Sequence, residues 1–223
     1  MKIKIDIKEK LEMEISRINN ILLKAQEAFL IVEYLYGYEE DKDLYDIKNT
    51  NDFLGYSKYI YWQVMVMELS KLFKYNTSKP DKINSNDRFN LRLFINKFKP
   101  KGEFHHFKIS NIKLKEWIHK LDHNEEIIKN ILTQRNKLYA HEEETLIKNI
   151  VPLHQIKPLM LIVYDILKEI HHTIFERGID FTPINSPVIN LKVIVNNLAK
   201  YKKIKLNEYK SLADDYGLED ELK

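Results

Sequence analysis

Apolar residues recur three and four positions apart along most of the chain, the spacing that places side chains on one face of an α-helix. No stretch alternates between apolar and polar residues strongly enough to require a β-strand. The pattern predicts helices over residues 7–36, 53–75, 85–98, 110–123, 124–140, 153–177 and 187–201. Polar connectors are expected over residues 39–52 and 76–84, and Gly178 is expected to end the helix before it.

The connectors between these segments are compatible with neighbouring helices that pack side by side. The sequence therefore predicts an all-α fold, an antiparallel helical bundle with additional helices. With 223 residues the chain is most simply one domain over residues 1–223, in which residues 178–223 form a C-terminal extension. Ser85 is expected to cap the third helix.

One charged residue interrupts the apolar pattern. Ile131, Leu138 and Tyr139 belong to one apolar stripe of the helix expected over residues 124–140, and Arg135 lies within that stripe. Only five of the 36 basic residues are arginine, so this chain uses lysine for most generic positive charge. The planar guanidinium binds a phosphate or a carboxylate through two hydrogen bonds, which lysine cannot do. We expect Arg135 to meet an anion, a water-filled cleft or a subunit boundary.

Two carboxylates are candidate partners for this arginine. Glu68 and Asp165 each lie within an apolar run of another predicted helix. Either could hold the guanidinium in place for function, and the same pairing could also be a purely structural ion pair.

His141 follows Arg135 by six residues, which corresponds to about 9 Å of helical rise and a different helix face. The two side chains can converge if the helix ends near Ala140. Three glutamates follow at residues 142–144, and negative charge is unfavourable at a helix C-terminus, which supports an end there.

Arg135-Asn136 followed by His141 resembles the signature of the HEPN superfamily (higher eukaryotes and prokaryotes nucleotide-binding), in which an arginine, often followed by asparagine, precedes a histidine. The pattern Arg-Asn-Lys-x-x-Ala-His, with an aromatic-rich segment upstream at residues 59–63, is similar to the AbiU-type abortive-infection branch. The resemblance covers about residues 5–175.

The resemblance implies a metal-independent endoribonuclease that leaves a 2′,3′-cyclic phosphate, acting in antiviral defence or as a toxin. His141 would serve as general base or acid, Arg135 would stabilise the charge on the phosphate, and Asn136 would orient it. In this family two motifs usually face each other across a homodimer. A partner such as an antitoxin or another defence protein is also implied.

Basic residues near the motif and in one connector are candidate RNA contacts. Lys137 follows the Arg-Asn pair, and the connector over residues 97–108 carries Lys99, Lys101 and Lys108 interleaved with phenylalanines. Lysines suit phosphates and aromatic rings suit unstacked bases. The alternative is a solvated loop whose phenylalanines pack onto the bundle.

Composition excludes several other classes. The absence of cysteine removes disulfides, thiol nucleophiles and cysteine-based zinc sites, and the five separated glycines form no phosphate-binding loop. His119 and His123 have a metal-binding spacing, but Lys120 stands where a zinc-protease motif requires glutamate. We expect no metal and no cofactor.

The net charge of +3 is nearly balanced, so RNA would have to meet a local basic patch. The longest apolar run, residues 159–164, is too short to span a bilayer, and the N-terminus does not resemble a signal peptide. We expect a cytoplasmic protein without membrane contact.

Two other interpretations stay open on sequence grounds. The chain could be a non-catalytic HEPN-like module that binds RNA, a nucleotide or a partner protein. It could also be a helical structural protein in which the motif is fortuitous.

Overall fold

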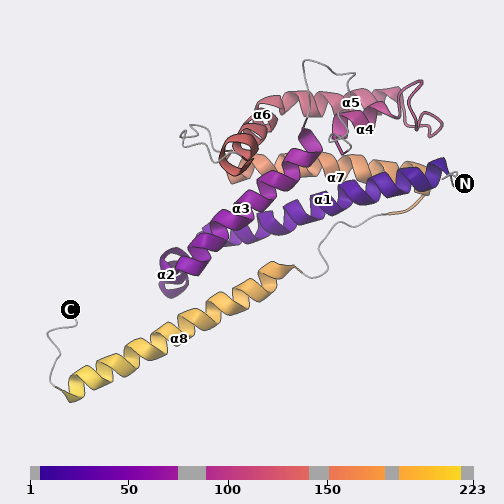
Figure 1. The fold of residues 1–223 in the computed structure, drawn as a ribbon. Coiled ribbons are helices and arrows are strands. Elements are labelled where there is room, and N and C mark those ends of the chain that lie inside the picture. Colours follow the sequence, from indigo (N-terminus) through magenta and orange to yellow (C-terminus); the bar gives the residue numbers. More distant parts are fainter. Residues whose placement is uncertain (1–5, 75–88, 141–150, 179–185, 217–223) are drawn as a thin grey trace, which may run out of the picture. The chain divides into compact units, whose positions relative to one another are not determined.

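The computed structural model describes residues 6–74, 89–140, 151–178 and 186–216 (Figure 1), and every regular element in these ranges is helical, as the apolar spacing predicts. The elements are α1 (Ile7–Tyr36), α2 (Lys42–Thr50), α3 (Asp52–Phe73), α4 (Leu91–Asn96), α5 (Asn111–His123), α6 (Glu125–Gln134), the π-helical segment η2 (Arg135–Ala140), α7 (Leu153–Phe175) and α8 (Pro187–Asp215). Among these ranges no helix is long and apolar enough to cross a membrane.

The chain divides into two compact units, which differs from the simplest expectation of a single domain. Unit 1 combines Met1–Phe29 with Trp62–Pro183, and unit 2 combines Leu30–Tyr61 with Ile184–Lys223. The expected C-terminal extension over residues 178–223 is therefore not an isolated appendage, because its helix shares a core with residues from 30–61.

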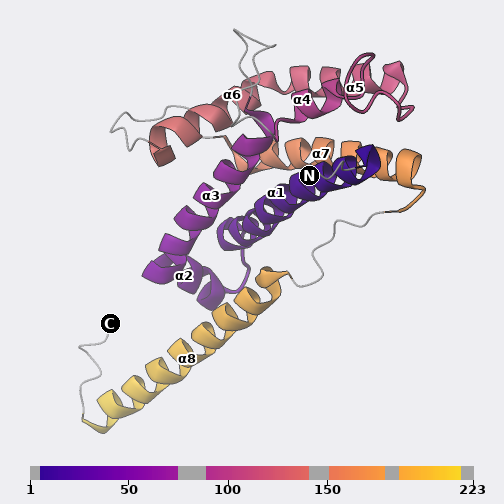
Figure 2. The ribbon, with the colours of Figure 1, turned by 45° about the vertical axis from the view of Figure 1, so that its right-hand side comes forward.

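Unit 1 is a helical bundle in which the first part of α1 and the whole of α7 lie side by side (Figure 2). The two helices are antiparallel, since the Lys8 ammonium near the start of α1 lies 5.4 Å from the centre of the Phe175 ring at the end of α7. Their inward faces follow the predicted spacing of three and four. The buried residues of these faces are Leu11, Ile15, Ile18, Leu22, Ala25 and Phe29 on α1, and Ile156, Leu159, Met160, Val163, Ile166, Leu167 and Ile170 on α7.

The shorter helices of unit 1 form a second layer, in which α5 packs against α4, α6 and α7. Ser110 caps α5 as expected, because its hydroxyl accepts a hydrogen bond from the Lys113 backbone N–H at 3.2 Å. Trp117 of α5 is buried in this layer, together with Leu114 and Leu121. This layer positions α6 and therefore the Arg135 motif that follows it.

Unit 2 has its own core, made from the end of α1, α2, the start of α3 and the first half of α8. The core residues are Ile31, Leu35, Ile47, Leu54, Val195 and Ala199. Lys48 is 1% exposed beside them, and its ammonium donates to the Gly37 carbonyl at 2.8 Å and to Glu39 at 3.2 Å. It also lies 4.7 Å from the centre of the Tyr34 ring. This lysine ties α2 to the C-terminal end of α1.

A second lysine of unit 2, Lys58, is also buried, and it donates to the Asn49 side chain at 3.0 Å. Burial, assisted by the nearby positive charge of Lys48, lowers the pKa of Lys58. Burial and the charge of Glu39 raise the pKa of Tyr34. Unit 2 thus places cations and phenol rings around one apolar core.

Several expected boundaries are wrong. The connector expected over 39–52 contains α2, whose N-terminus is capped by the Asp41 carboxylate; it accepts from the Asp43 and Leu44 backbone N–H groups at 2.9 and 3.2 Å. The helix expected over 85–98 is the short α4, capped by Asn90, and Ser85 lies outside the described residues.

The two helices nearest the C-terminus also differ from expectation. α7 is closed by Glu176 in a left-handed conformation, with φ of 52°, and not by Gly178. α8 continues to Asp215, although the apolar pattern predicted an end at Tyr201. Lysine, leucine and glutamate favour helix there, and Lys205 and Glu208 pair at 2.7 Å one turn apart.

Replacement of Lys48 tests its role in unit 2. We expect Lys48→Met to lower the free energy of unfolding by about 1–3 kcal/mol, because the buried Gly37 carbonyl loses its donor. Lys42→Met, at an exposed position of the same helix, is the matched control and should change stability little. Urea denaturation followed by circular dichroism measures both, and equal effects would contradict the anchoring role.

Candidate functional site

The Arg135 motif lies where the helix changes its hydrogen-bonding pattern. α6 ends at Gln134, and η2 begins at Arg135 and continues to Ala140 without an intervening loop. In a π-helix each N–H bonds to the carbonyl five residues earlier, so the side chains no longer follow the α-helical register. The apolar stripe derived from α-helical geometry therefore does not continue unchanged through the motif.

Gln134, not Arg135, occupies the buried position of this helix. Ile128, Ile131 and Gln134 are spaced by three and are buried, and Gln134 is 0% exposed. Arg135 is half-buried at the edge of this face. The expectation that Arg135 lies in the middle of the apolar stripe is wrong, because the buried line follows steps of three and passes through its neighbour.

The Arg135 guanidinium donates to the Asn136 side-chain oxygen at 2.8 Å, and Asn136 is exposed. The two expected carboxylate partners pair with lysines instead. Glu68 accepts from Lys71 at 2.5 Å, and Asp165 lies 3.4 Å from Lys120. The expected pairing of Arg135 with Glu68 or Asp165 is therefore not the arrangement that the structure shows.

The remaining residues of the motif are placed in part. Lys137 is half-buried within η2. His141, the expected general base or acid, lies outside the described residues, which end at residue 140 in this part of the chain. The arrangement of Arg135, Asn136 and Lys137 is thus the part of the site that can be analysed.

The connector over residues 97–108 is folded onto unit 1. Phe98 and Phe104 are 4% and 0% exposed, and their ring centres are 5.5 Å apart. Phe94 and Phe107 also contact the Phe104 ring, with centres 6.3 Å away in each case. The phenylalanines that could have stacked on bases are part of a hydrophobic cluster, so the alternative of a solvated loop packed onto the bundle is the one observed.

Ion pairs hold the same connector in place. Lys97 pairs with Glu14 of α1 at 2.5 Å and with Glu103 at 3.5 Å, and Lys10 of α1 also bonds to Glu103. Burial opposes ionisation of Glu103, but the hydrogen bond from Lys10 and the charge of Lys97 outweigh it and lower the pKa of Glu103.

The three lysines predicted to contact RNA in this connector have exposed side chains. These residues are Lys99, Lys101 and Lys108. Lys101 adopts a left-handed conformation with φ of 71° in the turn before Gly102. They are available to solvent, whereas the aromatic half of the predicted RNA surface is not.

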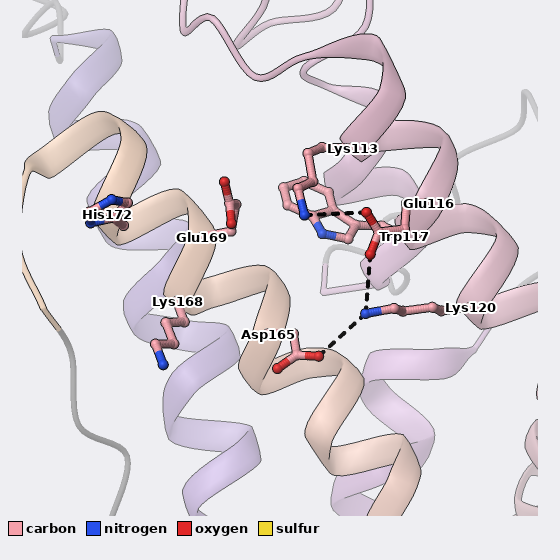
Figure 3. A pocket seen from close by; sticks show the side chains of 8 residues that line it. All are labelled: Lys113, Glu116, Trp117, Lys120, Asp165, Lys168, Glu169 and His172. Atoms are coloured by element: carbon pink, nitrogen blue, oxygen red, sulfur yellow. Dashed lines mark hydrogen bonds and ion pairs between the residues drawn. The ribbon is translucent and has the colours of Figure 1, made fainter.

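A pocket of about 300 Å³ lies between α5 and α7 (Figure 3). Glu116 bonds to Lys113 at 3.2 Å and to Lys120 at 3.4 Å, and Lys120 also pairs with Asp165. The hydrogen bond from Lys113 and its charge lower the pKa of Glu116. The pocket is completed by Trp117, Lys168, Glu169 and His172. Its three lysines face three carboxylates, so it has no surplus of positive charge to bind a phosphate.

Within the described part of the chain, no cluster of three or more histidine, cysteine, aspartate or glutamate side chains is arranged to hold a metal ion. His119 and His123 are both exposed on α5.

No protein-family model, curated protein or solved structure matches this chain. The resemblance to the HEPN superfamily consequently depends on the motif and on its position late in a helical bundle.

Sequence reasoning missed Gln134, although its spacing of three from Ile131 and Ile128 was visible. It also missed the π-helical turn, for which side-chain periodicity gives no signal, because the change lies in the backbone hydrogen bonds.

The different burial of adjacent residues generates a stability test. We expect Arg135→Ala to lower the free energy of unfolding by less than about 1 kcal/mol, since its guanidinium is half-exposed. Gln134→Ala should cost about 1–3 kcal/mol, because it removes a fully buried side chain. Thr133→Ala, at an exposed position one residue earlier, is the control. Urea midpoints at neutral pH provide the comparison, and a larger loss for Arg135→Ala than for Gln134→Ala would mean that Arg135 is a structural residue.

Proposed function

We propose that this protein is a metal-independent endoribonuclease of the HEPN type, which acts in antiviral defence or as a toxin. Arg135, Asn136 and His141 supply the catalytic groups. The proposal combines the motif resemblance with the local structure around Arg135.

The change from α-helix to π-helix at Arg135 is the observation that carries the proposal. Short π-helical segments are rare and frequently occur at functional sites. Here the segment begins at the arginine of the motif and ends at Ala140, immediately before the histidine of the motif.

The contact between Arg135 and Asn136 supports the same function. Asn136 is neutral, so its hydrogen bond orients the guanidinium without cancelling its charge. An arginine bound to a buried carboxylate would instead have its charge compensated. We assign Asn136 the role of a positioning residue that directs Arg135 towards a phosphate.

The reaction requires no metal, because RNA supplies its own nucleophile. The 2′-hydroxyl oxygen attacks the adjacent phosphorus while a base removes the hydroxyl proton. The bond from phosphorus to the 5′-oxygen breaks, and an acid protonates that oxygen. The products are a 2′,3′-cyclic phosphate and a 5′-hydroxyl. Histidine suits these proton transfers because its pKa is ordinarily near neutrality, and we assign His141 this role.

Arg135 supplies the electrostatic part of this mechanism. Negative charge on the non-bridging phosphate oxygens increases in the transition state, and a guanidinium can bond to two of these oxygens. Lys137, Lys99, Lys101 and Lys108 would attract the RNA backbone from further away. Two motifs in a homodimer would complete one shared cleft, as the HEPN resemblance implies.

The second candidate function is a non-catalytic HEPN-like module that binds RNA, a nucleotide or a partner protein. The exposed lysines of the 97–108 connector favour it as much as catalysis. It differs in one observable property, since a binding module does not turn over substrate.

Substitutions in the motif separate these functions. We expect His141→Ala to lower RNA cleavage by about a hundredfold or more, because proton transfer is lost. Arg135→Lys should be nearly as damaging, since it keeps the charge but loses the planar pair of donors. His123→Ala, which removes an exposed histidine from α5, is the matched control and should cleave like the wild type.

The assay is cleavage of total bacterial RNA in the presence of EDTA, with the ends analysed for 2′,3′-cyclic phosphate. Cleavage by His141→Ala at the wild-type rate would indicate a contaminating nuclease. RNA binding without cleavage by the wild type would favour the binding module.

A further inference from the structure

The second half of α8 carries an apolar stripe that its own unit does not cover. Leu206, Tyr209, Leu212 and Tyr216 are 49%, 60%, 51% and 76% exposed, and we call these four residues the α8 stripe. Their spacing of three and four places them along one face of the helix. Apolar side chains that are exposed together in this way mark an interaction surface.

This stripe continues the face that packs into the core of unit 2. Val195 and Leu206 are 11 residues apart, as are Leu198 and Tyr209, which corresponds to about three helical turns. Val195 belongs to the core and Leu198 packs against it, whereas Leu206 and Tyr209 are exposed. The residues that α8 contributes to this core all precede Tyr201. The same helix face is therefore covered in its first half and exposed in its second.

The charges along this half of α8 are distributed unequally. Lys202 and Lys203 precede the stripe, and Asp214 and Asp215 lie at its other end. Lys203 and Asp214 are 11 residues apart, so they flank the same side of the stripe. An antiparallel copy of the helix brings the basic end of each chain to the acidic end of the other, whereas a parallel copy opposes like charges.

We propose that the α8 stripe is a self-association surface, which pairs with the α8 stripe of a second copy in antiparallel orientation, centred on Tyr209. In this register Leu206 faces Leu212 of the second copy, and Tyr209 faces its own counterpart. Lys203 lies near Asp214 of the second copy, and two-fold symmetry repeats that ion pair. The surface lies outside the Arg135 motif and adds to the proposed function without depending on it.

Introduced cysteines test both the partner and the orientation, because the chain has no cysteine of its own. Helices that pack at 8–10 Å bring facing Cα atoms within the range a disulfide needs. Under mild oxidation we expect full-length Tyr209→Cys to form a disulfide with itself. Leu206→Cys and Leu212→Cys should each remain uncoupled alone and form a mixed disulfide when combined. Val193→Cys, 54% exposed in the first half of α8 on a different face, is the control.

The pattern of cross-links decides among the alternatives. Self-coupling of Leu206→Cys and Leu212→Cys together would indicate parallel pairing and overturn the proposed orientation. Tyr209→Cys that couples no more than Val193→Cys at tens of micromolar, or that is protected from thiol reagents in a monomer, would overturn self-association.

A charge exchange provides independent evidence. Lys203→Asp should reduce the Tyr209→Cys cross-link, and adding Asp214→Lys to the same chain should restore it. Failure of the double variant to recover, with the helix content of both variants unchanged by circular dichroism, would contradict the ion pair. Loss of the cross-link leaves RNA cleavage as a separate readout, so failure of this surface is distinguishable from failure of the proposed nuclease.

Discussion

The change from α- to π-helical hydrogen bonding at Arg135 decides which side chains of the motif face the core of unit 1 and which face solvent. The last turn of α6 is held by Ile128, Ile131 and the buried Gln134. Because the change of register begins one residue later, Arg135 stays at the edge of the buried face and bonds to Asn136. A guanidinium that is fixed on one side and partly exposed is suited to stabilise a phosphate. The functional account depends on this local geometry more than on any other contact.

Charged residues elsewhere in the described structure are mostly used to join elements. Lys97 connects the 97–108 connector to α1, Lys120 connects α5 to α7, and Lys48 connects α2 to the end of α1. In each case the lysine has a carboxylate or carbonyl partner from another part of the chain. Arg135 differs because its observed partner is a neutral neighbour in sequence. This contrast favours a role for Arg135 outside the scaffold.

The long helices could be predicted from the sequence because burial of one face dominates their periodicity. α1 begins and ends where the spacing predicts, and the inward face of α7 contains the predicted residues. The helix α2 could not be found this way, since it is short and mostly polar, although Asp41 was an available capping signal. The extent of α8 was missed because its second half has the apolar spacing without a covering partner in unit 2. Periodicity indicates which face is apolar, but not what covers it.

The site was predictable in composition and only partly in geometry. The motif identified Arg135 and Asn136, but their mutual hydrogen bond and the lysine partners of Glu68 and Asp165 depend on three-dimensional placement. The phenylalanines near Lys99 and Lys101 show the same limitation. Interleaved cations and rings suit RNA, yet the rings gain more by packing together in the core.

The most direct test of the central claim, that Arg135 and His141 promote attack by the RNA 2′-hydroxyl, is a comparison of two strands by ³¹P NMR in EDTA. One strand is an RNA that the protein cleaves, and the other has the same sequence with 2′-deoxyribose throughout. The account predicts that a cyclic phosphate resonance appears only with the ribose strand, while the deoxyribose strand remains intact. Cleavage of both strands at similar rates, or binding of both with no new resonance, would contradict it.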